Sequence, residues 1–449
     1  MKAVVLLFMS VILLHSVFAA NAAGSENTVS LREAILESFS SNHALKAQAS
    51  GLEASRADIG IARSPLLPSV AIEEKYLRTT NPTYAFMAKL NQQRFSARDF
   101  AIDTLNDPAD TGDFQTLFSI EQPLFVKQAN VGLDMAKTQQ EAATRQYLRK
   151  KEEIALEVVR VFLMARTSGE YVTVAEKGVE DAREHARISE LRFANGLGLY
   201  SDTLRARTVV TAAEQKLVSA RKNRDVARKG LGLLMSRDDA VEPDREAVDL
   251  VLLDIDYYEK ASLRREDVKA LELQHENAQN SLQLAEAAYL PTVGLGGSYE
   301  FNDHDAPFGS EGESWQVAAV ARWSLFDGGK REYEKVKARH RIAETREYLH
   351  GLQKAVSFKV YEAYQAVEEA RKNLELAQAA LLTAEEGQRL VRVRYENSLS
   401  PLIDLLDAQV ALDHARAAVV ARGNDLELGK AALGCEGGTL LQDLGLADQ

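Results

Sequence analysis

Cysteine and tryptophan are the rarest residues of this 449-residue chain, which has one cysteine, Cys435, and two tryptophans. A single cysteine excludes an internal disulfide framework and any metal cluster built from several cysteines. Basic residues are also in deficit, since 54 Lys and Arg stand against 66 Asp and Glu and leave a formal net charge of −12. This deficit argues against a nucleic-acid partner, because phosphate binding requires an excess of Lys and Arg.

Proline is scarce and unevenly placed. The two longest windows without proline are the 119 residues between Pro123 and Pro243 and the 93 residues between Pro307 and Pro401. An internal proline costs a helix about 3 kcal/mol, so these windows are where very long helices can form. A chain divided into several compact domains would be interrupted more often. The proline map therefore favours an elongated helical architecture.

Long hydrophobic runs are missing except at the N-terminus. Met1 and Lys2 precede an apolar run over 3–14, and small residues follow it. This pattern predicts a signal peptide over 1–22. The run is shorter than the roughly 20 residues of a spanning helix, and no later run reaches that length. We therefore expect an exported chain that could cross a membrane only as a β-barrel.

The chain matches itself at an offset of about 202 residues. The segment LRFANGL at 191–197 lies over VRYENSL at 393–399, and Asp202 then falls on Asp404. The alignment predicts a first structural repeat over 23–240 and a second over 241–449. Each repeat is expected to hold two strands and two principal helices, with a further helix ahead of the strands.

Apolar residues recur every seven positions through both copies, as in the series from Val158 to Ala186. A seven-residue repeat sustained this long predicts coiled-coil packing. The pattern predicts two long helices, each about 68 residues and roughly 100 Å in length. The expected helices are the long ones at 127–195 and 330–397, shorter return helices at 201–235 and 401–433, and preceding helices at 31–63 and 257–289.

Four segments alternate apolar and polar residues, at about 66–78, 113–125, 290–302 and 314–326. This pattern is typical of barrel strands that face lipid on one side, and also of soluble half-buried hairpins. Trp315 and Trp323 favour the membrane, because eight strand residues span roughly 26 Å, close to the apolar band of a barrel of about 25 Å. We expect these two tryptophans to form part of a membrane girdle. The long loop at 79–112 is expected to be functional or mobile.

Four strands cannot close a barrel, so the membrane interpretation requires an oligomer. Two copies would give eight strands and a filled interior, and three would give twelve strands and an open lumen. A tube with long helical walls favours the hollow form. The predicted fold class is therefore mainly α with membrane β: a trimeric 12-stranded β-barrel continued by a long α-helical coiled-coil barrel.

No pattern in the chain indicates catalysis. The eight histidines are scattered, and the zinc-protease, nucleophile-elbow and phosphate-loop motifs do not occur. We therefore expect no enzyme activity, no catalytic residues, no cofactors and no metal site. Asp303, His304 and Asp305 could bind a metal, but a solvated loop is the expected state.

The pattern R-[FY]-x-N-x-L occurs twice, at 192–197 and 394–399, and a strand leads into a long helix through Leu325-Phe326-Asp327-Gly328-Gly329. Over about residues 25–435 the chain resembles the TolC-like outer-membrane efflux protein family. The resemblance implies a homotrimer with a barrel in outer-membrane lipid and a helical tunnel across the periplasm. It also implies a periplasmic adaptor (membrane fusion) protein and an inner-membrane RND or ABC transporter as partners, with drugs, metals or proteins as cargo.

The resemblance assigns roles to the residues around the two helical turns. Asp404 and Asp407 match the aspartates that narrow the periplasmic entrance, and Asp202 holds the corresponding place in the first copy. The helix dipole alone would also favour these carboxylates, so a stabilising role remains the alternative. The turn residues match the tips that contact the adaptor; they are Gly196, Leu197, Leu199, Ser398, Leu399 and Pro401.

The two copies differ at two of these positions. Ser398 stands where the first copy has Gly196, and Arg205 stands where the second has Asp407. The function expected is the exit duct of a tripartite efflux or type I secretion system. The alternative is a periplasmic coiled-coil structural or adaptor protein whose hairpins never enter the membrane.

Overall fold

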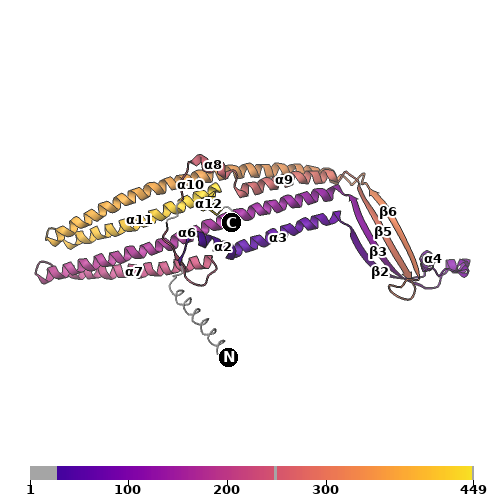
Figure 1. Cartoon of the computed structure of the whole chain (residues 1–449), viewed down its shortest axis with the longest axis horizontal. Helices are drawn as coiled ribbons and strands as arrows, with labels where there is room; N and C mark the ends of the chain where they lie inside the picture. The colour runs from indigo at the N-terminus through magenta and orange to yellow at the C-terminus, as the bar shows by residue number, and fades with distance from the viewer. Residues whose placement is uncertain (1–27, 247–249, 447–449) are drawn as a thin grey trace, which may run out of the picture. The chain divides into compact units, whose positions relative to one another are not determined.

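The computed structural model describes residues 28–246 and 250–446 (Figure 1). The signal peptide expected over 1–22 lies outside these residues. The chain divides into two compact units. The first comprises Met1–Ala49, Gln146–Val268 and Gly351–Gln449, and the second comprises Ser50–Arg145 and Lys269–His350.

Four helices account for much of the chain. Helix α6 (Lys127–Ala194) has 68 residues and α10 (Lys330–Glu396) has 67, and both take part in the two units. The return helices are α7 (Tyr200–Leu234) and α11 (Leu402–Gly437). Helix α11 continues four residues past the expected end at 433 and stops at Gly438, whose φ of 74° is the left-handed conformation that favours glycine at a helix end. Neither α6 nor α10 contains a proline, as the proline map requires.

The expectation of single helices over 31–63 and 257–289 was wrong. Asn42 separates α2 (Leu31–Ser41) from α3 (His43–Arg63), because its side-chain oxygen accepts from the amides of Ala44 and Leu45 and so caps a new helix. The second segment is divided into α8 (Ile255–Ser262) and α9 (Glu266–Ala287). Arg265 occupies that break, where it is buried and paired with Asp267 and Glu436.

The core of the first unit is a cluster of apolar side chains from several helices. Phe162 and Leu163 of α6 and Leu231 of α7 are fully buried in it, together with Ile35 of α2 and Cys435 of α11. Burial raises the pKa of the Cys435 thiol to about 12, so this thiol is unreactive at neutral pH. A short parallel pair, β1 (Thr28–Val29) with β4 (Glu242–Pro243), borders the cluster.

The second unit contains a four-stranded antiparallel sheet in the order β2-β3-β5-β6 (Figure 1). The strands are β2 (Ser69–Thr79), β3 (Thr111–Phe125), β5 (Thr292–Asp303) and β6 (Gly312–Arg322). The first-copy hairpin thus pairs directly with the second-copy hairpin through β3 and β5. In the described part of the chain, the outer edges of β2 and β6 have no strand partner.

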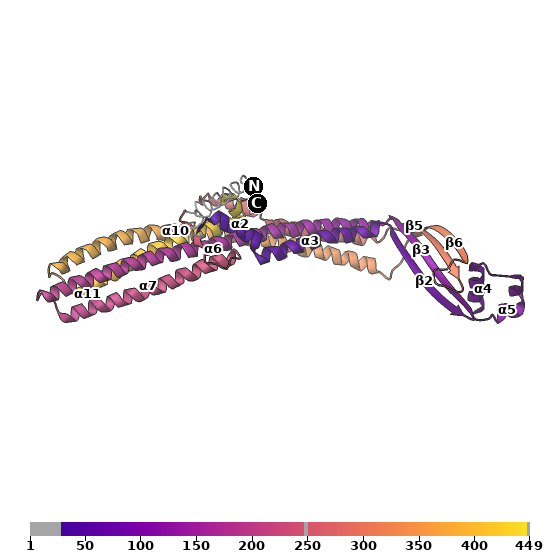
Figure 2. The ribbon, with the colours of Figure 1, turned by 60° about the horizontal axis from the view of Figure 1, so that its bottom comes forward.

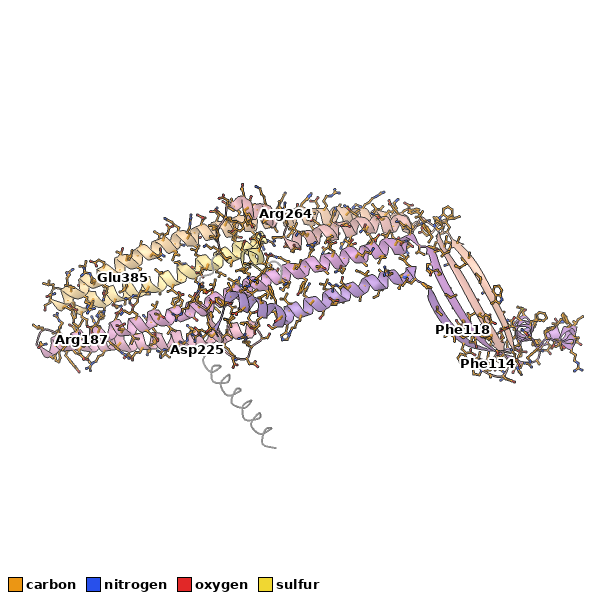
Figure 3. The ribbon with its side chains drawn as sticks, in the orientation of Figure 1. Phe114, Phe118, Arg187, Asp225, Arg264 and Glu385 are labelled. Carbon is orange, nitrogen blue, oxygen red and sulfur yellow. The ribbon has the colours of Figure 1, made fainter. Side chains whose placement is uncertain are left out.

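The sheet has one apolar and one polar face. Ile72, Phe118, Tyr299 and Trp315 are directly opposite one another across the four strands and are all exposed. Figure 3 labels Phe118 and Phe114 on β3. The other face carries a polar row of Ala71, Ser119, Ser298 and Gln316, in which only the first member is apolar. The alternation expected from the sequence is therefore present in the sheet.

The expected strand at 314–326 was placed too far along the chain. Strand β6 ends at Arg322, because this residue pairs with Thr292, the first residue of β5, and no further partner backbone is present. Trp323 therefore lies just beyond the strand, where its indole nitrogen donates to the carbonyl of Tyr289 at 3.0 Å. Trp315 and Trp323 are both exposed, at 73% and 61%, but only Trp315 belongs to the strand.

The loop expected at 79–112 is largely structured. It contains α4 (Pro82–Asn91), a 3-10 turn η2 (Ala97–Phe100) and α5 (Ile102–Asn106), which lie beyond one end of the strands (Figure 2). The rings of Phe86, Phe95 and Phe100 pack edge to face within it. Lys89 and two hydrogen bonds from Ser96 lower the pKa of Asp99 to about 2.

Among the described residues, none of the helices combines the length and hydropathy that a membrane span requires.

Candidate functional site at the two helical turns

The turn between α6 and α7 and the turn between α10 and α11 have the same backbone hydrogen bonds. The amide of Leu197 donates to the carbonyl of Arg192 at 2.8 Å, and the amide of Leu399 donates to that of Arg394 at 2.8 Å. In each turn an asparagine side chain also donates to the carbonyl four residues earlier, from Asn195 and from Asn397. The two turns are thus built alike, 202 residues apart.

The left-handed position of each turn is filled by a different residue. Gly196 has a φ of 70° and Ser398 a φ of 64°. Glycine adopts this conformation without a Cβ clash, whereas serine does so at some cost. The Ser398 hydroxyl accepts a hydrogen bond from Arg192 at 3.1 Å, which offsets part of that cost. The substitution of serine for glycine therefore preserves the turn.

Arg192 joins the two turns. Its guanidinium donates to the carbonyl oxygens of Tyr395 and Glu396 on the second turn and to that of Leu197 on its own turn. It also lies over the ring of Tyr395, 4.5 Å from the centroid, a favourable cation–π arrangement. We call these contacts, with the hydrogen bond to Ser398, the Arg192 clasp. The sequence contained this arginine in its repeated motif but gave no sign of its partners.

The turn residues expected to contact a partner are exposed. Leu197, Leu199 and Leu399 have exposed fractions of 65%, 67% and 70%. Gly196, Ser398 and Pro401 are exposed as well. Single exposed leucines are ordinary on protein surfaces, but three at two adjacent turns form an apolar surface that a partner could cover.

The carboxylates expected at the gate lie just after the turns. Asp404 and Asp407 are exposed on the first turns of α11, and Asp202 is half-buried in the first turn of α7. Within the described residues, none of these three carboxylates has a hydrogen bond or an ion pair. The positive ends of the two helix dipoles stabilise these carboxylates.

A buried polar layer lies further from the turns, between α6, α10 and α11. Gln409 is its centre: the amide nitrogen donates to Asp181 at 3.1 Å and to Asp413 at 2.9 Å. Its oxygen accepts from Gln388 at 3.1 Å and lies 3.0 Å from Nε2 of His185. The Nε2 atom of His185 also lies 3.4 Å from the amide nitrogen of Gln388, so His185 contacts both glutamines of the layer through this ring nitrogen. Its Nδ1 is buried and has no partner among the described residues.

Two opposing effects act on Asp413 in this layer. Burial raises its pKa, and the hydrogen bond from Gln409 and the charge of Arg416 lower it by less. Arg416 is engaged mainly by Asp181, at 2.7 Å. A polar layer at a coiled-coil seam fixes the register of the helices that share it. No pattern in the sequence indicated this layer, although His185 is adjacent to Ala186 on the predicted seam.

Beside this layer α6, α7 and α11 line a groove of about 780 Å³. About half of its lining residues are small and apolar, such as Ala175 and Ala213, and polar side chains that include Lys216 and Asp413 make up most of the rest. Because the apolar side chains are short, they leave the space between the three helices partly unfilled, and this space is the groove.

The loop between β5 and β6 gathers Asp303, His304 and Glu311. One potential ligand atom from each lies within 4.8 Å of the others. His304 is bound through both ring nitrogens, to Glu311 at 2.7 Å and to Asp305 at 3.0 Å. Asp303 accepts from the amides of Asp305 and Ala306. These hydrogen bonds close the loop, so the arrangement has a structural explanation.

Comparison with known proteins identifies the family. The sequence matches the outer membrane efflux protein family over residues 34–236 and 257–433. The chain belongs to this family. The match confirms the family expected from the repeated R-[FY]-x-N-x-L pattern, and it locates the protein in the outer membrane.

Individual relatives agree with this assignment. CyaE of Bordetella pertussis is 25% identical over 397 residues, which cover 85% of this chain and 78% of CyaE. OprJ, an outer membrane protein of Pseudomonas aeruginosa, is 24% identical over 60% of this chain and 59% of its own length. The crystal structure of the outer membrane protein VceC of Vibrio cholerae has the same fold, with a TM-score of 0.75, 16% identity and coverage of 91% of this chain and 96% of VceC.

The fold is accordingly the mainly helical fold of TolC-like channels. The matching family is defined by efflux rather than by a catalysed reaction. An outer-membrane location favours the duct over the alternative of a periplasmic protein that stays out of the membrane.

Proposed function

We propose that this efflux-family protein is the passive outer-membrane exit duct of a tripartite export machine. It would work as a homotrimer, with a 12-stranded barrel in the outer membrane and a coiled-coil tunnel in the periplasm. A periplasmic adaptor and an inner-membrane RND or ABC transporter would supply cargo and energy. The protein itself would carry no catalytic site and require no cofactor.

The open, two-faced sheet carries this proposal. Strands β2 and β6 leave their backbone groups unpaired at the edges in the described chain, which is untenable in lipid unless another copy completes the sheet. The row Ile72, Phe118, Tyr299 and Trp315 is exposed in one chain and would face lipid in the closed barrel. Three copies supply twelve strands and an open lumen, whereas two supply only a filled barrel.

The helical turns provide the entrance in this proposal. Three copies would place six carboxylates, from Asp404 and Asp407, around the axis, with Asp202 of each copy nearby. The exposed apolar turn residues Leu197, Leu199 and Leu399 would contact the adaptor. The internal duplication then gives six similar turns, which suits an adaptor that binds each in the same way.

Reconstitution tests the duct directly. The full chain, purified in detergent, is expected to have the mass of a trimer by native mass spectrometry and to form cation-selective pores in planar lipid bilayers. A soluble, detergent-independent protein without conductance would contradict the proposal. A chromosomal deletion then distinguishes the cargo classes, because loss of drug resistance, of metal resistance or of a secreted protein are separate phenotypes.

A further inference from the structure

The Arg192 clasp uses only half of a duplicated arrangement. Arg394 is the second-copy counterpart of Arg192, and its own backbone carbonyl makes the same turn bond. Its side chain is exposed. Across the described residues it has neither a hydrogen bond nor an ion pair. Arg394 therefore has the same position in its turn as Arg192 but makes no contact like those that Arg192 makes with the opposite turn.

The groups that Arg192 contacts also have counterparts in the first turn, and no arginine contacts those counterparts within the described chain. Tyr395 is 3% exposed because Arg192 and α6 cover it, while its counterpart Phe193 is 44% exposed. Carbonyls of Phe193 and Ala194 correspond to those of Tyr395 and Glu396 that accept from Arg192. The side-chain site of Ser398 is the one element without a match, since Gly196 has no hydroxyl.

Apolar residues around the two turns show the same contrast. Ile188, Leu402 and Leu406 are buried with Tyr395 in one cluster between the first and second hairpins. Their exposed fractions are 8%, 1% and 7%. The residues 202 positions away are Leu390, Tyr200 and Leu204, and their exposed fractions are 49%, 55% and 47%. The first and second hairpins of one chain thus bury these apolar residues against each other. The equivalent residues on the other side of each hairpin are exposed in the single chain.

We propose that Arg394 of one copy clasps the first turn of the next copy, and that Leu390 packs there against Phe193, Tyr200 and Leu204 of that copy. The Arg394 guanidinium would donate to the carbonyls of Phe193 and Ala194 of the next copy and to Leu399 of its own chain, and would stack on the Phe193 ring. This inference rests on the proposed trimer and specifies the contact that joins its subunits at the turns.

The partner that best matches this exposed turn surface is a second copy of the chain. A second copy of this chain presents the same turn backbone that Arg192 already binds, so each half of the contact has a counterpart in the structure. Space is available, because a Cβ added at Gly196 would meet no atom within 4 Å. The buried polar layer is not repeated, since Gly387 and Arg207 stand where the layer has His185 and Gln409. The repeated interface is therefore confined to the turn region.

Disulfide trapping tests this contact in the full-length protein. The variant carries Arg394→Cys with Ala194→Cys, and the matched control carries the intrachain pair Arg192→Cys with Glu396→Cys. Native Cys435 stays in place, because its buried thiol does not compete for oxidation. After oxidation in membranes, a denaturing gel without reductant should show covalent dimers and trimers for the first pair. The control pair should remain at monomer size.

The outcomes separate the contact from the trimer. If the first pair gives only monomers while native mass spectrometry still finds trimers and the control pair oxidises, the proposed contact is wrong and the duct stands. If no trimer exists in detergent or membranes, the proposed function fails first. A third variant, Arg394→Cys with Val251→Cys, places the second thiol on an exposed site in the linker and should give no ladder.

Discussion

Asp404 and Asp407 are three residues apart at the start of α11, so their carboxylates share one side of the helix. A helix N-terminus favours negative charge by about 0.3–1 kcal/mol per group, and this alone could account for the two residues. That stabilisation is available to either carboxylate separately. A role in conduction instead requires the two charges to act on passing ions.

Neutralising both carboxylates distinguishes the two roles. The double variant Asp404→Asn and Asp407→Asn removes six charges from the proposed trimer and keeps side-chain size. We expect the cation-over-anion permeability ratio in planar bilayers to fall severalfold, because rings of carboxylates raise the local cation concentration.

Glu385→Gln is the matched control, since this exposed glutamate lies on α10 away from the turns (Figure 3). Its permeability ratio should equal that of the unmodified protein. An unchanged reversal potential in the double aspartate variant would assign Asp404 and Asp407 to helix stabilisation alone.

In the buried layer centred on Gln409, the carboxyl group of Asp413 is expected to make the stability of the fold depend on pH. Burial raises the pKa of Asp413 in the folded state above its unfolded value. The ionised form therefore destabilises the fold at pH values above the folded pKa, and this penalty is relieved as the pH falls through it. Asp181, Arg416 and Lys216 are the charged groups that act on Asp413.

Asp413→Asn isolates the contribution of this carboxyl. The amide oxygen can still accept from Gln409, so the variant should be at least as stable as the unmodified protein near neutral pH. The gain in stability that the unmodified protein shows on acidification should shrink by no more than about 1 kcal/mol after solvent screening. The thermal stability of both proteins is measured at each pH, and the difference between them removes the contributions that the other titratable groups make to both. A variant that is less stable at neutral pH would show that the charge is needed.

Packing of the loop helix α4 against the sheet depends on one glycine. A Cβ on Gly312, the first residue of β6, would overlap the carbonyl oxygen of Asn91 at the end of α4. Gln92, next in the chain, is buried and bonds to the Gly112 carbonyl at 2.9 Å and to Asp113 at 2.8 Å. The loop therefore closes onto the end of the sheet only if position 312 has no side chain.

Gly312→Ala is expected to displace α4 and to make the segment 80–110 sensitive to protease added outside intact cells. The control is Gly351→Ala in α10, where an added Cβ meets nothing within 4 Å. Alanine should stabilise that helix by roughly 0.5–1 kcal/mol. Equal protease resistance in the two variants would mean that the loop adjusts to a side chain at position 312.

For the assembled molecule, the turn surface is expected to serve docking and not the pore itself. The double variant Leu197→Asp and Leu399→Asp places charge on this apolar surface. Burying an unpaired charge in an interface costs well over 1.4 kcal/mol, so export in cells should fall by at least about tenfold. The purified trimer should still form conducting pores, which shows that the loss of export does not come from a failure to fold or to assemble.

Val251→Asp is the control for this pair, because Val251 is an equally exposed aliphatic residue in the linker between the two copies. Export by this variant should match that of the unmodified protein. If the turn variant also exports normally, the partner does not contact these leucines.

The long helices and the alternating strands could be predicted from the sequence, because both depend on local periodicity. A seven-residue repeat without proline has few alternatives to α6 and α10, and apolar–polar alternation defines the two faces of β3 and β5. Glycine at position 196 permits the left-handed conformation of the first turn without a Cβ clash, so a turn could be predicted there. The left-handed Ser398 could be anticipated only from its position in the duplicated motif.

The chemistry of the amino acids alone thus determined the element types, the duplication pattern and the family resemblance, since each is written in spacing along the chain. Contacts between distant residues depended on the folded chain. The Arg192 clasp joins residues about 200 positions apart, the Gln409 layer draws on three helices, and the end of β6 depends on where β5 begins. Spacing along one helix says which side a residue faces, but not which backbone carbonyl another helix brings to meet it.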